Sequence, residues 1–353
     1  MKTKPVMTMG AVILSYVFLL ATPLFAREST DVIVMKNGDH LTGEIKGLNA
    51  GVLYMSMSYI LGTSSVEWSN VARLESKQLF LVKTEDGSVY TGTLNTTEAP
   101  NGRPMEIKVV ETTGEAVINS ARIVEMDMTS SKFFQRFNGN INTGIIYSKG
   151  NQSTQYSLAS LVAYPRERWG AQASFNSTLS ASTGATASTR NQLDLEAFRL
   201  LRWDNWFYAG VGTFLQSSEQ GIIRQTTFGG GVGRYLKNSN LARISVTAGF
   251  VGQNTEYQQN IDSQNLGSGL IAADLQFFRF NKTNGSLSAV LMPVISEPGR
   301  VKFNMNASYY IKLTGNLSWN VSVYGNWDNR PPGDLSGSDY GSSSGLSWTF
   351  GNK

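Results

Sequence analysis

The side chains that most often do chemistry or hold metal ions are nearly missing from this chain. Its 353 residues include one histidine, His40, and no cysteine. A serine hydrolase needs an imidazole beside its nucleophile, as does a protease built on an aspartate–histidine pair. Disulfides and thiolate metal sites are excluded together with cysteine. The sequence therefore predicts no enzyme, no catalytic residue, no metal and no cofactor, and we interpret His40, beside Asp39 in a turn, as a solvated side chain.

One acidic segment has a superficial similarity to an oxygen-rich calcium loop. Asp328 and Asn329 are followed by Asp334 and Asp339. The spacing does not fit an EF-hand loop, and no bidentate glutamate follows. We expect a solvated external loop here.

The most informative pattern is an alternation of apolar and polar residues. Every second residue from Val301 to Leu313 is apolar, the residues between them are mostly polar, and residues 316–326 repeat this arrangement. A period of two is typical of a β-strand, because successive side chains point to opposite faces. Segments of about 10 residues can cross a bilayer at a tilt, and no apolar run of transmembrane-helix length follows residue 26. We predict an all-β chain whose larger part, residues 133–350, is an antiparallel transmembrane β-barrel.

Twelve such segments can be counted after Phe133. Their connections alternate between tight turns, such as Asp204-Asn205, and mostly longer ones, such as 329–338. Short periplasmic turns with longer external loops are typical of outer-membrane barrels, and an even strand number returns both ends to the periplasm. The expected spans are 134–148, 153–165, 168–181, 188–203, 205–218, 222–236, 241–257, 263–280, 285–296, 300–313, 315–328 and 339–350.

The alternation also predicts which side chains line the lumen. Charges of both signs are mixed among them, so strong ion selectivity is not expected. Such a lining can conduct small polar solutes or join into a closed hydrogen-bonded plug, and a bore of twelve strands does not decide between the two. The candidates are Asn140, Asn142, Gln172, Asn176, Arg190, Gln192, Asp194, Glu196, Arg243, Asp274, Gln276, Lys302, Asn304, Asn306, Lys312, Asn320 and Asn326.

Aromatic residues concentrate near the expected strand ends. Such rings suit the boundary between headgroups and hydrocarbon, and two-rim placement favours a membrane barrel over a soluble β-protein. We expect Phe133, Phe134, Phe137, Tyr164, Trp169, Trp203, Trp206, Phe207 and Trp348 near the periplasmic rim, and Tyr147, Tyr257, Trp327 and Tyr340 near the other.

The amino terminus predicts export. Lys2 and Lys4 precede an apolar stretch from Ala11 to Leu20, and cleavage after Ala26 would remove residues 1–26 as a signal peptide. Without the two lysines, 28 basic residues face 26 acidic ones. No basic stripe is present, so nucleic acid is not an expected partner.

Residues 30–127 form a different unit that repeats at an offset of 49. Residues 37–45 align with 86–94, and 70–74 with 119–123. Asn37-Gly38 and Asp86-Gly87 predict hairpins with type I′ turns. We expect two small barrels of SH3-like or Sm-like type, residues ~30–76 and ~77–127, packed together in the periplasm. A short linker, 128–132, would hold this module against the periplasmic mouth of the barrel. A binding module with a periplasmic partner and a mere spacer remain equal alternatives.

The carboxy-terminal part resembles the salt-induced outer-membrane proteins, a family of largely uncharacterised function. The resemblance rests on residues 137–140 and 147–151, on Trp203-Asp204-Asn205-Trp206, and on residues 229–235, and it covers roughly 134–350. It implies an outer-membrane β-barrel in contact with outer-membrane lipid, and it brings no catalytic residues. Leu346, Trp348 and Phe350 have the spacing of a strand that the outer-membrane assembly machinery recognises, although three residues follow Phe350.

Two functions are compatible with these observations. One is a narrow passive channel for small hydrophilic solutes, gated or covered by the periplasmic module. The alternative is a non-conducting structural or envelope-stress protein whose working part is the module.

Overall fold

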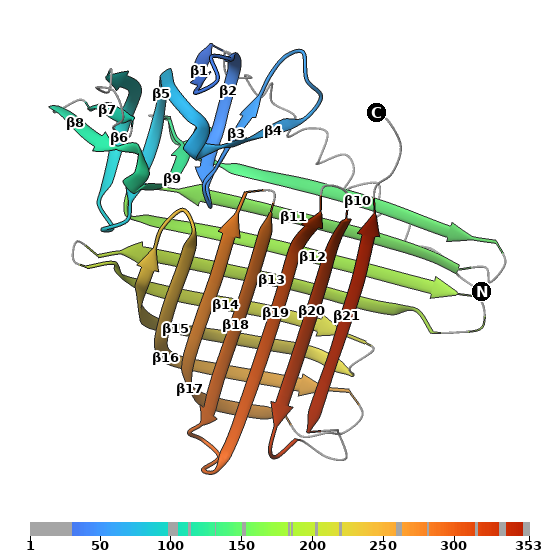
Figure 1. The fold of residues 1–353 in the computed structure, drawn as a ribbon. Helices are drawn as coiled ribbons and strands as arrows, with labels where there is room; N and C mark the ends of the chain where they lie inside the picture. The colour runs from blue at the N-terminus through green and yellow to red at the C-terminus, as the bar shows by residue number, and fades with distance from the viewer. Residues whose placement is uncertain are drawn as a thin grey trace.

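The computed structural model describes two β-sheets that follow one another along the chain (Figure 1). The residues described are 30–97, 105–111, 114–130, 132–149, 153–182, 184, 186–201, 204–218, 221–258, 263–280, 282–314, 317–331 and 337–348. The predicted signal peptide, Trp203 and Phe350 lie outside them. In this part of the chain the helices are three short 3₁₀ turns, none with the length and apolarity that a membrane span requires.

The first sheet, which we call the module, has nine strands and holds the hydrophobic core. Its order is β4-β3-β2-β1-β5-β6-β7-β8, and β9 pairs with both β2 and β5, which makes the sheet barrel-like. Nineteen buried apolar side chains form one cluster that includes Ile33, Leu53, Phe80 and Ile107. Its elements are β1 Asp31–Met35, β2 His40–Asn49, β3 Val52–Ser56, β4 Thr63–Glu67, η1 Trp68–Asn70, β5 Val71–Thr84, β6 Val89–Thr97, β7 Glu106–Glu111, β8 Gly114–Asn119, η2 Ser120–Arg122 and β9 Ile123–Met128.

Each half of the module opens with a hairpin of the same geometry, although the turn type differs from the prediction. Gly38 and Gly87 adopt positive φ of 91° and 81°, whereas neither Asn37 nor Asp86 does. The amides of Gly38 and Gly87 donate to the carbonyls three residues earlier, a type I turn closed by a left-handed glycine. The predicted type I′ turn is therefore wrong here.

The two halves share one core and one long strand, β5. The offset of 49 relates the two hairpins, but the 3₁₀ turns η1 and η2 start 52 residues apart, at Trp68 and Ser120. The predicted alignment of 70–74 with 119–123 is therefore displaced by three residues. The indole Nε1 of Trp68 donates to the carbonyl of Ser120 at 2.9 Å and so ties the halves together.

The second sheet has twelve antiparallel strands in strict sequence order, β10 to β21. This confirms the predicted number of strands. Residues 134–136 form the 3₁₀ turn η3 (Phe134–Arg136), so the first strand starts four residues later than expected. The strands are β10 Asn138–Ser148, β11 Ser153–Pro165, β12 Trp169–Ser182, β13 Ser188–Leu200, β14 Trp206–Ser217, β15 Ile222–Asn238, β16 Ala242–Tyr257, β17 Gln264–Arg279, β18 Thr283–Val294, β19 Arg300–Thr314, β20 Leu317–Asp328 and β21 Ser338–Trp348.

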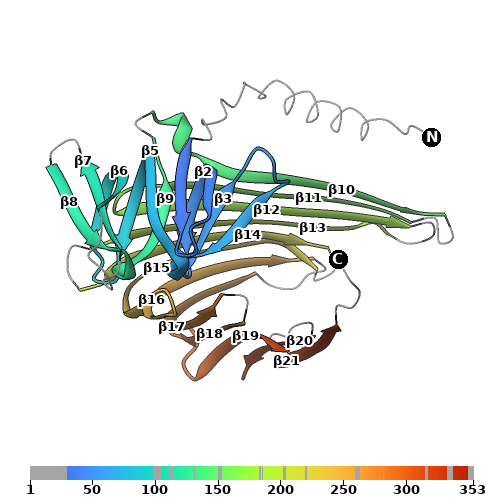
Figure 2. The same cartoon turned by 45° about the horizontal axis from the view of Figure 1, so that its top comes forward.

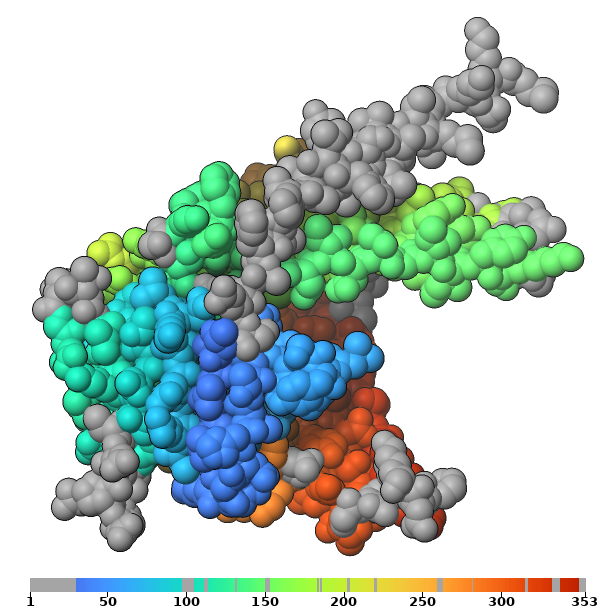
Figure 3. Space-filling model, turned by 90° about the horizontal axis from the view of Figure 1, so that it is seen from above, coloured from blue at the N-terminus to red at the C-terminus, as the bar shows by residue number. Residues whose placement is uncertain are grey.

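The twelve-stranded sheet is strongly curled, and the module covers one of its ends (Figures 2 and 3). The covered end carries the tight turns. At one of these, Asp204 and Asn205 have φ of 48° and 59°, the paired positive values of a type I′ turn. We call this end the module end and the opposite one the outer end.

Candidate functional site

The pairing register divides the twelve-stranded sheet into two continuous faces, because residues directly opposite each other in an antiparallel ladder point the same way. On one face, Ile271 pairs with Leu291, which pairs with Phe303, which pairs with Trp327. On the other face, Gln276, Ser286, Ser308, Ser322 and Ser343 form a similar row. We call these the apolar face and the polar face.

All seventeen candidate side chains predicted from the sequence lie on the polar face. The ladders connect them across strands, for example Gln172 with Glu196 and Arg243 with Gln276. By strand they are Asn140 and Asn142 on β10, Gln172 and Asn176 on β12, Arg190, Gln192, Asp194 and Glu196 on β13, Arg243 on β16, Asp274 and Gln276 on β17, Lys302, Asn304, Asn306 and Lys312 on β19, and Asn320 and Asn326 on β20.

Two contacts show how these side chains are organised. Along β13, Arg190 donates to Gln192, whose amide donates to Asp194 at 2.9 Å. Across the sheet, Lys302 Nζ on β19 donates to Gln253 Oε1 on β16 at 3.4 Å. Two strands lie between them, and neighbouring strands are about 4.8 Å apart. A lysine reaches that far only because the sheet bends towards this face, so the polar face is concave.

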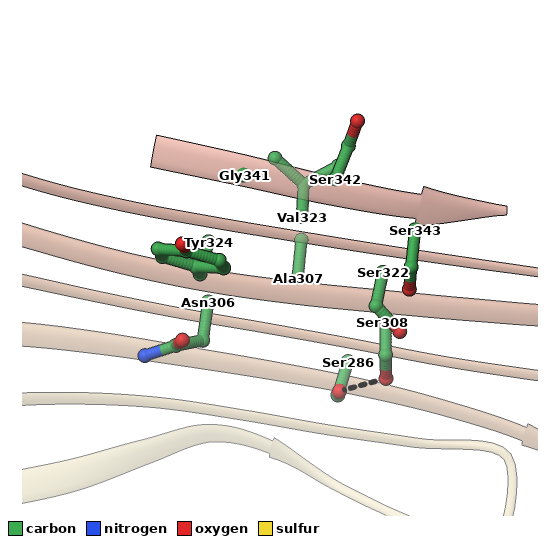
Figure 4. A pocket seen from close by; sticks show the side chains of 10 residues that line it. All are labelled: Ser286, Asn306, Ala307, Ser308, Ser322, Val323, Tyr324, Gly341, Ser342 and Ser343. Atoms are coloured by element: carbon green, nitrogen blue, oxygen red, sulfur yellow. Dashed lines mark hydrogen bonds between the residues drawn. The ribbon is translucent and has the colours of Figure 1, made fainter. Parts of the chain in front are cut away.

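Sequence reasoning missed a row of serines in this concavity. Ser286, Ser308, Ser322 and Ser343 lie directly opposite one another on β18–β21, and the hydroxyls of Ser286 and Ser308 are 2.7 Å apart. With Asn306 and Tyr324 they line a hollow of about 570 Å³ (Figure 4). The alternation assigns Ser308 and Ser322 to the polar side of their strands. None of the four serines is among the residues predicted to line the lumen.

The polar face also carries apolar side chains that the prediction did not include. Phe198 and Val211 share it with Glu196, since Glu196 pairs with Val211 and Phe198 is two residues further along β13. The lining is therefore mixed near β13 and β14. It becomes consistently polar towards β19 and β20.

The module contacts the polar face at the module end of the twelve-stranded sheet. Two turn asparagines donate to backbone carbonyls of the module: Asn205 to Glu85 at 2.8 Å, and Asn240 to Ile123 at 2.7 Å. The Arg243 guanidinium lies 3.8 Å from the carboxylate of Glu125 on β9. Lys83 lies 5.7 Å above the ring of Phe198. The module thus contacts two strands of the twelve-stranded sheet, β13 and β16, and two of its turns.

A cluster of charges lies at this interface. Lys83 Nζ donates to Glu125 Oε1 at 2.8 Å and to Asp127 Oδ2 at 3.2 Å, and Lys83 is only 8% exposed. Because β5 pairs with β9, Lys83 lies directly opposite Glu125. We call Lys83, Glu125, Asp127 and Arg243 the interface cluster.

The cluster shifts the protonation of its members. Burial opposes the charge on Lys83, but the two carboxylates outweigh it and raise the pKa of Lys83. Burial also opposes ionisation of Glu125, yet Lys83 and Arg243 lower its pKa. For Asp127, burial and the nearby Glu125 outweigh Lys83 and raise the pKa to about 6. One carboxyl of the pair therefore takes up a proton in mildly acidic solution.

A second ionic group lies at the outer end of β19 and β20. Arg300, 3% exposed, donates from Nη2 to Asp328 at 2.7 Å and from Nη1 to Glu297 at 2.8 Å. Asn329 accepts from the amide of Val301 at 2.8 Å. Asp328 is therefore held by an arginine. Asp334 of the same acidic segment lies outside the described residues.

The apolar face is exposed over much of its area. Ile145, Phe250, Ile271 and Leu346 are each more than half exposed. At the module end of β10–β12, Phe133, Phe137, Tyr164 and Trp169 form a chain of ring contacts with centroids 4.8–5.6 Å apart. These rings belong to the predicted periplasmic group.

The described residues offer no other recognisable chemical site. His40 is exposed at the start of β2. Within the part of the chain described here, no three side chains among histidine, aspartate and glutamate gather as metal ligands do.

Comparison with known proteins places the twelve-stranded sheet in a family. The family model described as "Protein of unknown function, DUF481" matches residues 141–350. No curated protein matches the chain.

Proposed function

The chain belongs to the DUF481 family, and from that premise we propose that it is an outer-membrane protein whose twelve-stranded sheet closes into a β-barrel around a narrow polar pore for small hydrophilic solutes. One observation carries the proposal. The register continues one mostly polar face and one mostly apolar face through all twelve strands, although the polar face is mixed near β13 and β14. A concave polar face with an exposed convex apolar one suits a wet interior and a lipid exterior.

Strand length supports the same proposal. The strands run from 11 residues in β10 to 17 in β15, and a tilted transmembrane strand needs about 9–11 residues. In water, the apolar side chains exposed on these strands would form a surface that soluble monomers rarely carry. In a bilayer the same surface is favourable.

The lining suggests weak selectivity between ions. Among the candidate residues, Arg190, Arg243, Lys302 and Lys312 are basic, and Asp194, Glu196 and Asp274 are acidic. Four positive and three negative groups along one wall give no strong field of either sign. The serine row adds uncharged hydrogen-bonding groups that suit neutral hydrophilic solutes.

Export and orientation follow from the remaining sequence signals. We propose that residues 1–26 act as a signal peptide, that the assembly machinery of the outer membrane inserts the barrel, and that the module lies in the periplasm. The tight turns then belong to the periplasmic end, where the module covers the polar face.

Single-channel recording in planar bilayers tests the proposal. The full chain is folded in detergent and compared with the double variant Glu125→Gln, Arg243→Gln, which loosens the module. We expect small conductance steps with little ion selectivity, and a higher open fraction in the double variant. Arg224→Gln, in the exposed pair Arg224–Glu256 at the outer end, is the control. Folded protein in which neither form conducts would count against a pore.

The second candidate is a non-conducting structural or envelope-stress protein that acts through its module. The contacts between the module and the twelve-stranded sheet favour it, because Asn205, Asn240 and Arg243 together hold the module at the polar face. In that case cross-linking of the full chain in cells should capture a periplasmic partner on the module, with no conductance from the purified protein.

A further inference from the structure

The twelve-stranded sheet has two margins, β10 and β21. Among the described residues no ladder joins these strands, and Figures 2 and 3 show them apart on the curled sheet. In hydrocarbon an open sheet edge is unfavourable, because no water is present to form hydrogen bonds with its backbone groups. If the sheet enters a membrane, its margins need partners.

We propose that β10 and β21 of the same chain pair with each other, with Thr143 opposite Ser344, and that this seam closes the barrel. The inference rests on the proposed membrane location and specifies the closing contact. The two strands match in length, at 11 residues each. Because the number of strands is even and all neighbours are antiparallel, β10 and β21 also run in opposite directions. An antiparallel seam needs no rearrangement of the other ladders.

The two faces restrict the register of the seam. Ile141, Thr143 and Ile145 lie on the apolar face of β10, and Ser342, Ser344 and Leu346 on the apolar face of β21. A slip of one residue would place apolar side chains of one strand beside polar ones of the other. Thr143 can therefore face only an even-numbered residue of β21, and Ser342, Ser344 and Leu346 are the candidates around the middle of the strand.

The stagger limits the possible registers of the seam further. By stagger we mean the number of residues by which a row of directly opposed partners, followed across all twelve strands, is displaced along the chain where β21 meets β10. The row of partners that starts at Asn138 runs through nine ladders to Arg300. Extended through the last two ladders it is level with position 335. Thr143, five residues further along, is therefore level with position 330. Pairing it with Ser344 gives a stagger of 14 residues (344 minus 330), and pairing with Ser342 or Leu346 gives 12 or 16.

Stagger and strand number together set the tilt of a closed barrel. With about 3.3 Å per residue and about 4.8 Å between strands, staggers of 12, 14 and 16 give tilts of about 35°, 39° and 43°. Membrane barrels tilt by about 35–45°, which places 12 at the lower limit. A stagger of 14 pairs residues 139–148 with 339–348, whereas 16 leaves only 141–148 opposite 341–348. The middle value combines a favourable tilt with the longer seam.

The same register gives suitable neighbours on the lipid side. It places Ile141 beside Leu346 and Tyr147 beside Tyr340, at positions where all four side chains are now more than half exposed. A stagger of 12 would instead place Ile141 beside Ser344. Apolar and aromatic cross-strand pairs of this kind stabilise a sheet.

Cysteine cross-linking tests the seam, because the chain has no cysteine of its own. Directly opposed residues in an antiparallel pair have Cα atoms about 4.5–5.5 Å apart, within disulfide reach. Full-length protein folded in lipid vesicles carries Thr143→Cys with Ser344→Cys, with Ser342→Cys or with Leu346→Cys. Thr143→Cys with Leu158→Cys, a pair within the β10–β11 ladder, is the positive control. Non-reducing gels separate intramolecular from intermolecular links.

We expect the Thr143–Ser344 pair to cross-link within the monomer at least five times faster than the other two seam pairs. A faster link to Ser342 or Leu346 would overturn the register. Disulfide-linked dimers, or no seam link while the control pair reacts, would overturn the closure. The pore proposal is tested separately, since a seam that forms in a protein without conductance contradicts the pore alone.

Discussion

Glu125 of the module and Arg243 of the twelve-stranded sheet lie 3.8 Å apart, and this ion pair joins the two sheets beside the buried Lys83. Each side chain is about one-quarter exposed. A partly exposed pair of this kind contributes up to about 1 kcal/mol. The ion pair is therefore strong enough to favour the docked position of the module on the twelve-stranded sheet. It is also weak enough to let the module move away from the sheet.

The first prediction concerns this ion pair. Arg243→Gln removes the attraction to Glu125 and should raise the population of the state in which the module is undocked two- to five-fold. This factor corresponds to the loss of an ion pair worth about 0.5–1 kcal/mol. Hydrogen exchange of the β9 amides in the full chain measures the opening. Arg224→Gln should leave that exchange unchanged, and equal protection in both variants would show that the pair does not hold the module.

The second prediction concerns pH. Burial and Glu125 raise the pKa of Asp127 from 3.8 to about 6, so the folded protein binds an extra proton in this window. The contribution of Asp127 to the free energy of unfolding therefore falls as pH rises from about 4 to about 6. Asp127→Asn should remove this decline and make the module at least as stable as wild type at pH 7.5. Thermal melts followed by fluorescence of Trp68, the one tryptophan of the module, measure the effect.

Asp86 supplies a control of opposite sign. Burial opposes its ionisation, but Thr84, Ser88 and Arg122 lower its pKa. A lowered pKa contributes stability above the ordinary value of 3.8 that is lost as pH falls through the folded-state value. Asp86→Asn should therefore make the module less stable at pH 7.5. If both asparagine variants changed stability in the same direction, the assigned charge interactions would be incorrect.

The third prediction concerns Lys83. Lys83→Met keeps the length of the side chain but leaves Glu125 and Asp127 facing each other without a cation. Breaking a buried ion pair in this way costs about 3–5 kcal/mol, and the partial exposure of both carboxylates reduces this to about 2–3 kcal/mol. Chemical denaturation at pH 8 and pH 5 should show a smaller loss at pH 5, where one carboxyl is protonated. Lys77→Met, at an exposed position of the same strand, should cost less than about 0.5 kcal/mol.

The fourth prediction separates the two faces of the twelve-stranded sheet. Met305 lies on the apolar face, and its neighbour Asn304 lies on the polar face. If the sheet forms the proposed membrane barrel, Met305→Lys should destabilise the inserted protein by about 2–4 kcal/mol, because it places a charge against lipid near mid-strand. Asn304→Lys should insert normally and shift the pore towards anions. Heat-modifiability gels measure insertion, and equal behaviour of the two variants would contradict the assignment of lipid and lumen faces.

Local pattern was sufficient to predict the large-scale architecture. The alternation in residues 133–350 predicts the strands, and the count of alternating segments gives their number. It also predicts the face on which each candidate residue lies, because a period of two is a property of the strand itself. The hairpins at Gly38 and Gly87 are also predicted from neighbouring residues, because Asn-Gly and Asp-Gly pairs favour tight turns. Their turn type was not, since Asn37 and Asp86 keep negative φ and the turn closes with a left-handed glycine alone.

Long-range contacts could not be predicted in the same way. Nothing in the residues around Lys83 or Arg243 indicates that they approach, because they are 160 positions apart in the chain. The pairing of β9 with β5 places Lys83 directly opposite Glu125, and the docking of the module brings Arg243 close to both. The serine row likewise arises only when four strands adopt their register.

By itself the sequence determined that this chain is all-β, in two parts, with twelve long strands that separate polar from apolar side chains. These properties depend on neighbours along the chain, whose spacing sets which face each residue occupies. Only the tertiary structure decided which turns of the large sheet the module contacts, which charges are buried there and how far the strands are staggered. Those properties depend on register and docking, where small shifts between distant segments change every contact.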